Sequence, residues 1–104
     1  MAYKIIITHS AQNQLDAAIH YILNVLQNEQ AALSVMEDAE KTGHRLSYAA
    51  GSLKLCDDPE LRALGYRMIH FKNHNYFMLY RIEDNTVYVD AIYHDLQDYE
   101  NMFK

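Results

Sequence analysis

The sequence predicts an α+β fold with two layers, in which a helical hairpin packs on an antiparallel sheet in the order β-α-α-β-β-β, followed by a short C-terminal helix or turn. Two observations lead to this fold class. Residues 65–94 are rich in β-branched and aromatic side chains that alternate with polar ones, which is typical of antiparallel strands. Residues 11–46 repeat apolar side chains every three or four positions, which is typical of amphipathic helices. The apolar face of the sheet is the surface that can bury both helices.

The N-terminal half should form one strand and two helices. Residues 3–8 are a short β-branched run and predict a strand that joins the later sheet in an undefined register. Residues 8–10 offer hydroxyl caps for a helix that begins at Ala11 and runs to about Gln27. Asn28 can cap a second helix. Its apolar face should hold Ala32, Met36, Ala39, Gly43 and Leu46, and its solvent face Glu29, Glu37, Asp38, Glu40 and Lys41.

The segments that flank the predicted sheet are polar. Residues 49–64 are the most irregular part, although Asp58 before Pro59 indicates a single helical turn. Residues 95–103 should form a short helix or turn. Three apolar side chains are spaced to dock this tail on the sheet, namely Leu96, Tyr99 and Phe103.

Three strands are expected over residues 66–71, 76–82 and 86–94. A two-residue loop at Asp84-Asn85 would pair Ile82 with Val87, Arg81 with Tyr88, Leu79 with Asp90 and Phe77 with Ile92. One face would then be core, with Tyr76, Met78, Tyr80, Ile82, Val87, Val89, Ala91 and Tyr93. The other would be a working surface, with Phe77, Leu79, Arg81, Tyr88, Asp90, Ile92 and His94. An odd number of residues in the connection before Tyr76 would place Arg67 beside Arg81, and an even number would place it across the sheet.

Length and composition bound the class of protein. The chain has 104 residues, of which 50% are hydrophobic, so a single domain over residues 1–104 is expected. The lone cysteine, Cys56, excludes an internal disulfide. No charged leader precedes a long apolar run, so we expect a cytoplasmic protein without a membrane segment. The formal net charge is −5, yet residues 62–82 contain four Lys or Arg residues and no acid, which predicts a local positive field.

The order and spacing of these elements resemble the RelE/ParE superfamily of toxins from type II bacterial toxin–antitoxin systems. The matching stretches are YKIIITHSAQNQLDAAIHYI at 3–22, Gly-Tyr-Arg at 65–67, the strand at 76–82 and the ending at 92–100. The resemblance implies a toxin that forms a hetero-oligomer with its cognate antitoxin, which covers the working surface. It also implies one of two activities, because RelE-like members cleave ribosome-bound mRNA whereas ParE-like members block DNA gyrase.

Metal-free RNA cleavage needs a group that transfers protons and cations that stabilise the charged phosphorane. We expect His94 to transfer the proton and Arg67 and Arg81 to hold the phosphate as the catalytic residues. Substrate binding would fall to Lys54, Lys72 and His70. By the resemblance, Arg67 and His94 occupy the positions of an arginine and a terminal-strand histidine in RNA-cleaving relatives. The acidic second helix and Asp95, where such relatives carry tyrosine, depart from that pattern.

Three functions follow from the sequence. The RNA-cleaving toxin ranks slightly first, because an arginine, a histidine and an acid-free hairpin exceed what a binding surface requires. The alternatives are a gyrase inhibitor without nuclease activity and an inactive relative that only binds antitoxin. Each residue also has a purely structural alternative. His94 would cap the last strand, and Arg81 would pair with Asp90. No cofactor or metal is expected, because His70 and His74 do not share a helical face.

Overall fold

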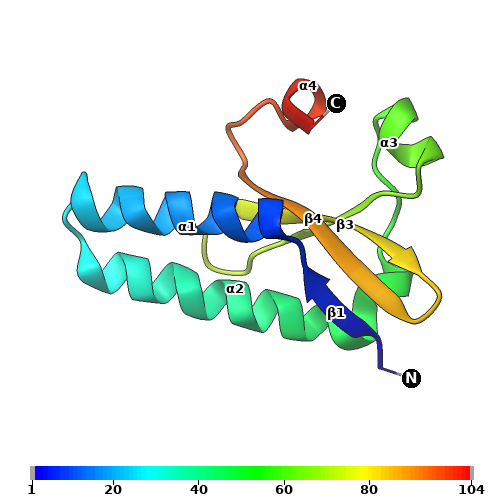
Figure 1. Cartoon of the computed structure of the whole chain (residues 1–104), viewed down its shortest axis with the longest axis horizontal. Coiled ribbons are helices and arrows are strands. Elements are labelled where there is room, and N and C mark those ends of the chain that lie inside the picture. The colour runs from blue at the N-terminus through cyan, green and yellow to red at the C-terminus, as the bar shows by residue number, and fades with distance from the viewer. Residues whose placement is uncertain (1, 104) are drawn as a thin grey trace.

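The computed structural model describes residues 2–103 as a four-stranded sheet with helices on both sides (Figure 1). The predicted fold class and element order are confirmed. In chain order the elements are β1 (Lys4–Ile7), α1 (His9–Asn24), α2 (Glu29–Ala49), the 3-10 turn η1 (Ala50–Ser52), α3 (Pro59–Ala63), β2 (Arg67–His70), β3 (Tyr76–Glu83), β4 (Thr86–His94) and α4 (Tyr99–Phe103).

Side-chain caps begin three of the helices, as the sequence indicates. Thr8 accepts a hydrogen bond from the Ala11 backbone N–H, and Asn28 accepts one from Ala31. Asp58 caps the single turn of α3 by accepting from the backbone N–H of Leu61. Such caps satisfy amide groups that have no partner within the first turn, and this explains where each helix begins.

The strands lie in the order β1-β4-β3-β2. β2, β3 and β4 form the expected antiparallel meander, and β1 joins the edge of β4 in parallel, with Lys4 opposite Thr86. The predicted two-residue loop is correct, since Glu83 pairs with Thr86 and Asp84 takes a positive φ of 55°. The meander and its turn are therefore as the sequence predicts.

The predicted register of β3 on β4 is correct near the turn and wrong beyond it. Tyr80 pairs with Val89, but Leu79 pairs with Ala91, so Asp90 is an extra residue in β4. Beyond this β-bulge, each side chain of β4 points to the face opposite to the one expected. Instead of the expected partners Asp90 and Ile92, Leu79 and Phe77 face Ala91 and Tyr93. The side chains of Ala91 and Tyr93 therefore lie on the face opposite to α1 and α2. Those of Ile92 and His94 lie on the face that α1 and α2 cover, which we call the helix-covered face.

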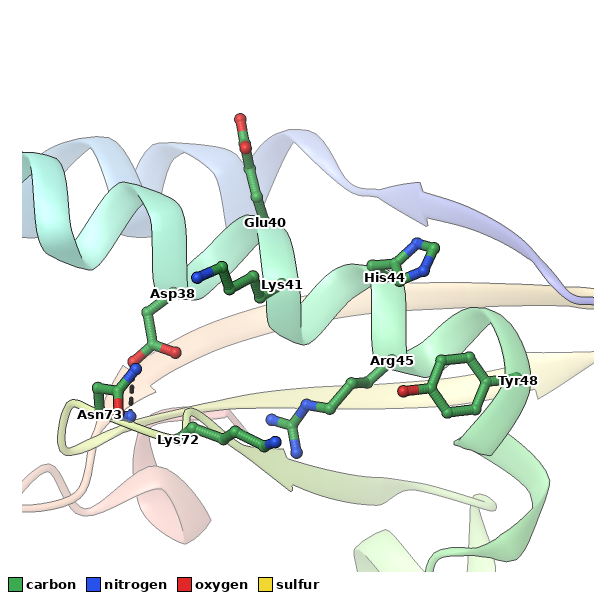
Figure 2. A pocket seen from close by; sticks show the side chains of 8 residues that line it. All are labelled: Asp38, Glu40, Lys41, His44, Arg45, Tyr48, Lys72 and Asn73. Atoms are coloured by element: carbon green, nitrogen blue, oxygen red, sulfur yellow. Dashed lines mark hydrogen bonds between the residues drawn. The ribbon is translucent and has the colours of Figure 1, made fainter.

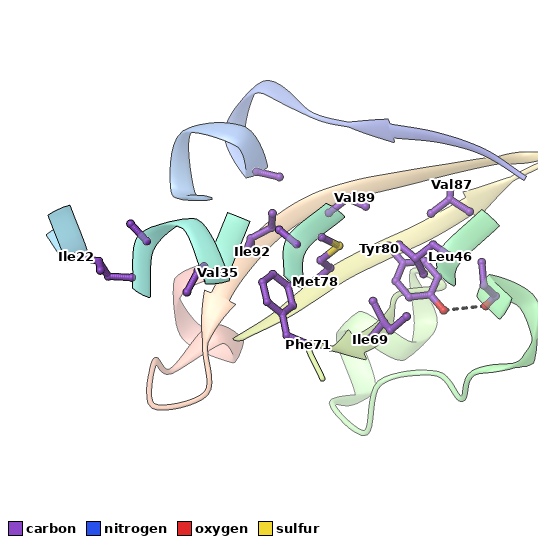
Figure 3. Close-up of a cluster of buried hydrophobic side chains, with 14 residues drawn as sticks. Ile22, Val35, Leu46, Ile69, Phe71, Met78, Tyr80, Val87, Val89 and Ile92 are labelled. Carbon is purple, nitrogen blue, oxygen red and sulfur yellow. Dashed lines mark hydrogen bonds between the residues drawn. The ribbon is translucent and has the colours of Figure 1, made fainter. Parts of the chain in front are cut away.

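α1 and α2 cover one face of the sheet and enclose the larger core (Figures 1 and 3). Leu46 of α2 is fully buried in this cluster together with Tyr80, Val87 and Val89. The Tyr80 hydroxyl donates to the Ala50 carbonyl over 2.8 Å, as Figure 3 shows. A buried tyrosine hydroxyl needs such a partner, and the bond joins the sheet to the end of α2.

A second cluster lies on the opposite face, where the sequence predicts an open working surface. Phe77, Leu79 and Tyr93 are buried there. The segments around α3 and α4 cover them with Leu61, Tyr66, Tyr99 and Phe103. Tyr99 and Phe103 dock as expected, whereas Leu96 is 90% exposed and does not. Much of the predicted working surface is therefore covered by the chain itself.

The tip of the helical hairpin projects beyond the sheet (Figure 1). α1 ends at Asn24, before the predicted Gln27, which has a positive φ of 51°. Val25 and Leu26, expected on the buried face, are exposed. Neither belongs to a core cluster of the described residues. Within residues 2–103, none of the helices combines the length and apolar character needed to span a membrane.

Candidate functional site

His94 ends β4 on the helix-covered face. Its Nδ1 accepts a hydrogen bond from the Leu96 backbone N–H at 3.1 Å, and its ring meets the Tyr76 ring edge-on at 5.0 Å. A hollow of about 420 Å³ lies beside it, between β4 and α1. Among residues 2–103, the side chains that line it with His94 are tyrosines, Gln14, Gln97 and small or apolar residues, without a Lys or Arg. His94 therefore has space beside it, and the described part of the chain contributes no cation to that space.

Arg81 lies on the opposite face and is held by two carboxylates. Its Nε donates to Asp90 Oδ2 at 2.8 Å, and its Nη1 lies 3.0 Å from Glu83 Oε1. The guanidinium also stacks 4.5 Å above the centre of the Tyr88 ring. The hydrogen bond to Asp90 raises the pKa of Arg81 above its ordinary range. The charge of Arg81 is thus already balanced inside the protein. This is the structural alternative that the sequence offered for Arg81, an ion pair with Asp90.

The same carboxylate binds a tyrosine. The Tyr66 hydroxyl donates to Asp90 Oδ2 at 2.7 Å. Burial, together with this hydrogen bond to an acid, raises the pKa of Tyr66 to about 12. Asp90 can reach both Tyr66 and Arg81 because the bulge leaves it without a partner residue in β3. This cluster joins β3 and β4 to the residue that precedes β2.

Arg67 lies on the helix-covered face, opposite Arg81 in direction. It pairs with Tyr80, whose side chain is in the helix-side core, and its Nη1 donates to the Leu53 carbonyl. The backbone N–H of Phe71 bonds the Tyr76 carbonyl at 2.9 Å, which leaves residues 72–75 as the connection. The connection thus has an even number of residues. For that case the sequence predicts Arg67 on the opposite face of the sheet from Arg81, as the structure shows.

Arg67, Arg81 and His94 therefore do not form one cluster. Arg81 is five positions along β3 from Tyr76, the partner of His94, which corresponds to roughly 16 Å. The expectation that Arg81, Asp90 and His94 share one surface is wrong. Its physical cause is the bulge at Asp90, which reverses the direction of His94.

The predicted substrate-binding residues are also divided between the faces. Lys54 lies 3.5 Å from Asp57, and His70 packs against Phe77 and lies 3.7 Å from Asp95. Lys54 and His70 line one shallow hollow of about 310 Å³. Lys72 instead lines a hollow along α2. Across residues 2–103 no three His, Cys, Asp or Glu side chains are grouped as a metal site would require.

The sequence analysis named Lys72 for substrate binding but missed the two cations that α2 contributes to the same hollow. Lys41 and Arg45 line it with Lys72, and His44 and Tyr48 complete the same side (Figure 2). We expected an acidic outer surface on this helix. The available signal is the spacing of the four α2 residues, which places them on one helical face.

An apolar groove of about 400 Å³ runs between β1, α1 and α2. Met36 and Gly43 of α2, expected in the core, border this open groove with Ile5, Leu15 and, at its floor, Met78 and Ile92. Nothing lies within 4 Å of the position that a Cβ of Gly43 would take. The chain therefore leaves a strip of apolar surface accessible beside its core.

Asp38 is buried, contrary to its expected place on the solvent face of the second helix. Its Oδ2 accepts from the Asn73 backbone N–H at 2.9 Å and lies 2.8 Å from His74 Nδ1. Burial alone would raise the pKa of Asp38, but the bonds to His74 and Asn73 outweigh it and hold that pKa below its ordinary value. Asp38 thus fastens the β2–β3 connection to α2.

Replacement of Asp38 by asparagine should lower the free energy of unfolding at pH 7 by about 1–3 kcal/mol. Because the folded state lowers the pKa of Asp38, its ionisation stabilises the fold fully above about pH 4 and progressively less as pH falls through that lowered pKa. Urea denaturation at pH 7 and pH 3 should show the two proteins converging in acid. Exposed Glu37→Gln is the control; equal stability of Asp38→Asn and the parent chain at pH 7 would refute this role.

Comparison with protein-family models matches residues 5–99 to the ParE toxin of the type II toxin–antitoxin system parDE. The chain belongs to the ParE toxin family. The match spans most of the described residues, from β1 to the start of α4. The ParE-family chain is accordingly a toxin of the type II toxin–antitoxin class, and the resemblance seen in the sequence is confirmed.

Solved structures share the fold of this ParE-family toxin. A chain of the chromosomal ParDE system from P. aeruginosa matches with a TM-score of 0.70 and 18% identity, covering 89% of this chain and 96% of that one. A chain of the RelBE2 toxin–antitoxin complex from Mycobacterium tuberculosis matches with a TM-score of 0.58 and 21% identity, covering 90% and 99%. At these identities the likeness concerns the fold. Comparison with curated protein sequences gives no match.

Proposed function

We propose that this ParE-family toxin acts in the cytoplasm by binding DNA gyrase, without cleaving RNA, and that a cognate antitoxin silences it. The observation that carries the proposal is the separation of Arg67, Arg81 and His94. RNA cleavage without a metal requires the proton-transfer group and the cations to reach one phosphate. Among the residues that the structure describes, the lining of the hollow beside His94 includes no Lys or Arg, and Arg81 is engaged by Asp90 and Glu83. This geometry favours the gyrase alternative over the RNA-cleaving one.

The family match supports the same choice. The matched model describes ParE toxins, and ParE-like members are the branch that the resemblance associates with gyrase. RNA cleavage by His94 with Arg67 and Arg81 is the competing function, and an inactive antitoxin-binding module is the third.

A paired assay on the purified chain separates these functions. One arm measures supercoiling of plasmid DNA by gyrase, and the other measures cleavage of mRNA on programmed ribosomes. We expect loss of supercoiling with intact mRNA, and restoration of supercoiling by the antitoxin. Cut mRNA with unaffected supercoiling would replace our proposal by the RNA-cleaving function, and no effect in either arm would favour the inactive module.

We further propose that the antitoxin inserts apolar side chains into the groove between β1, α1 and α2. Both solved structures described above come from toxin–antitoxin assemblies. The groove is apolar apart from Gln12 and Glu40 in its lining, and this chain does not fill it. Burial of apolar surface is the usual driving force for such a contact, and a segment with alternating or helically spaced apolar residues would fit.

Gly43→Leu should change the stability and the antitoxin affinity in opposite directions. A side chain there meets open space, so loss of the helix-interior glycine should raise the free energy of unfolding by about 0.5–1 kcal/mol. The same side chain would occupy the groove and weaken antitoxin binding by about tenfold, or ~1.4 kcal/mol. Calorimetric titration with antitoxin and urea denaturation measure the two effects.

Gly43→Ala provides a graded control, because it gives the helix the same backbone benefit with a single methyl group. Its antitoxin affinity should stay near that of the parent chain. If Gly43→Leu binds antitoxin as tightly as Gly43→Ala does, the antitoxin does not use this groove.

A further inference from the structure

A hollow of about 390 Å³ lies between the outer side of α2 and the connection that follows β2 (Figure 2). Lys41, His44, Arg45 and Tyr48 contribute from α2, at spacings of three and four residues that place them on one helical face. Lys72 contributes from the connection. The hollow is on another flank of α2 than the apolar groove, with Glu40 common to both linings.

Hydrogen bonds within the protein hold the Arg45 guanidinium in this hollow. Its Nη2 donates to the His70 carbonyl at 2.7 Å and lies 3.5 Å from the Thr42 hydroxyl. Both bonds use Nη2, and within residues 2–103 neither Nε nor Nη1 of Arg45 donates a hydrogen bond. Figure 2 shows the charged ends of Arg45 and Lys72 directed toward each other. The guanidinium is thus oriented in advance for a ligand that accepts hydrogen bonds.

The cations here lack internal counterions, unlike several elsewhere in the molecule. Lys54, Arg62 and Arg81 lie within 4.0 Å of carboxylates. In the part of the chain that the structure describes, Lys41, Arg45 and Lys72 have no such ion pair. Neither acid in the lining forms an ion pair with these cations, because Asp38 bonds His74 and Asn73, and Glu40 extends away from Arg45 and Lys72 (Figure 2). A bound anion would relieve the repulsion between these like charges.

The aromatic residues indicate which anion fits. Tyr48 is 63% exposed, and its ring meets the His44 ring at 6.1 Å beside the cations. An acidic peptide would use the cations and leave this exposed ring without a partner. A nucleotide with an unpaired base can place its phosphate on the cations and stack its base on Tyr48. The volume of the hollow lies in the ordinary range for small-molecule sites of roughly 300–1,000 Å³.

We propose that this hollow binds single-stranded nucleic acid, with one phosphate between Arg45 and Lys72, a neighbouring phosphate at Lys41, whose ammonium points toward the Asp38 end of the hollow (Figure 2), and a base on Tyr48. The site is separate from the gyrase proposal and from the antitoxin groove. Its occupant would contact a positive region on a chain whose formal net charge is −5. Most of the surface therefore contributes no general attraction to nucleic acid, and the contact depends on this hollow.

Fluorescence anisotropy of a labelled eight-nucleotide single-stranded DNA with the full chain tests the cations. The Lys41→Gln/Lys72→Gln variant removes two charges that have no internal ion pair, so its fold should persist. Each lost phosphate contact should reduce the salt slope by about 0.7, which makes binding roughly 25-fold weaker at 0.1 M salt for the pair. The control Lys4→Gln/Lys54→Gln removes the same charge elsewhere and should bind nearly as the parent does. Equal losses in the two double variants would overturn the proposal, since they indicate unspecific attraction.

An oligonucleotide of the same length with abasic sites tests the stacking. Tyr48→Ala should weaken binding of normal DNA by about fivefold or more, from ~1 kcal/mol or more of stacking per base, and should leave binding of the abasic strand unchanged. Equal effects on both strands would contradict a base on Tyr48. An acidic peptide that binds as tightly as the DNA, and loses affinity in Lys41→Gln/Lys72→Gln, would replace nucleic acid by an acidic protein segment.

Discussion

Replacing Leu46 by alanine should lower the free energy of unfolding by about 2–5 kcal/mol. Leu46 is 0% exposed and lies in the helix-side cluster with Tyr80 and Val87 (Figure 3). Removal of its side chain leaves a cavity beneath α2 that neighbouring side chains on a rigid sheet fill only in part. Urea denaturation followed by circular dichroism gives the difference.

The matched control is the same substitution at Leu96. Leu96 is 90% exposed, so Leu96→Ala should change stability by no more than about 0.5 kcal/mol. Comparable losses for Leu46→Ala and Leu96→Ala would contradict the positions that the structure gives these two side chains.

Asp90→Ala should cost about 2–3 kcal/mol, because it removes the acceptor shared by Tyr66 and Arg81. The side chain of Asp90 is 15% exposed and that of Arg81 is 30% exposed, so water compensates only partly. Glu83→Ala removes the exposed partner of Arg81 and should cost at most about 1 kcal/mol. Equal costs for Asp90→Ala and Glu83→Ala would show that the bulge cluster adds no stability beyond a surface ion pair.

Local signals predicted the elements well. Thr8, Asn28 and Asp58 cap helices where the sequence places caps, because a cap bonds an amide only three residues away. The turn at Asp84-Asn85 is likewise a local feature, and the strand pairs next to it are correct. Order and type of the elements therefore follow from short-range chemistry.

Long-range contacts decide what the sequence could not predict. Val87, Val89, Ala91 and Tyr93 alternate without interruption, so the pattern contains no sign of the bulge at Asp90. The bulge brings Asp90 to Tyr66, a residue of another segment. Asp38 looked solvent-facing because its partners, Asn73 and His74, lie in a distant connection. In both cases, contacts with residues distant in the sequence decide the position of an acidic side chain, and periodicity does not encode such contacts.

The bulge also has a consequence for function. A continuous register would have placed Arg81, Asp90 and His94 on one surface, which is the arrangement that favoured RNA cleavage. With the extra residue, Arg81 and Asp90 stabilise the far face, and His94 points toward the α1 side. A fold can keep its strands while losing a convergent site in this way, so activity has to be argued from the positions of side chains.

Growth of cells that express the His94→Asn variant without antitoxin decides whether proton transfer by this histidine is needed. Asparagine keeps an acceptor for the Leu96 backbone N–H but has no group that titrates near neutral pH. If the toxin acts by binding gyrase, viable counts after induction should fall as far with His94→Asn as with the parent chain. Normal growth with a folded His94→Asn protein, while the parent chain kills, would contradict that mechanism.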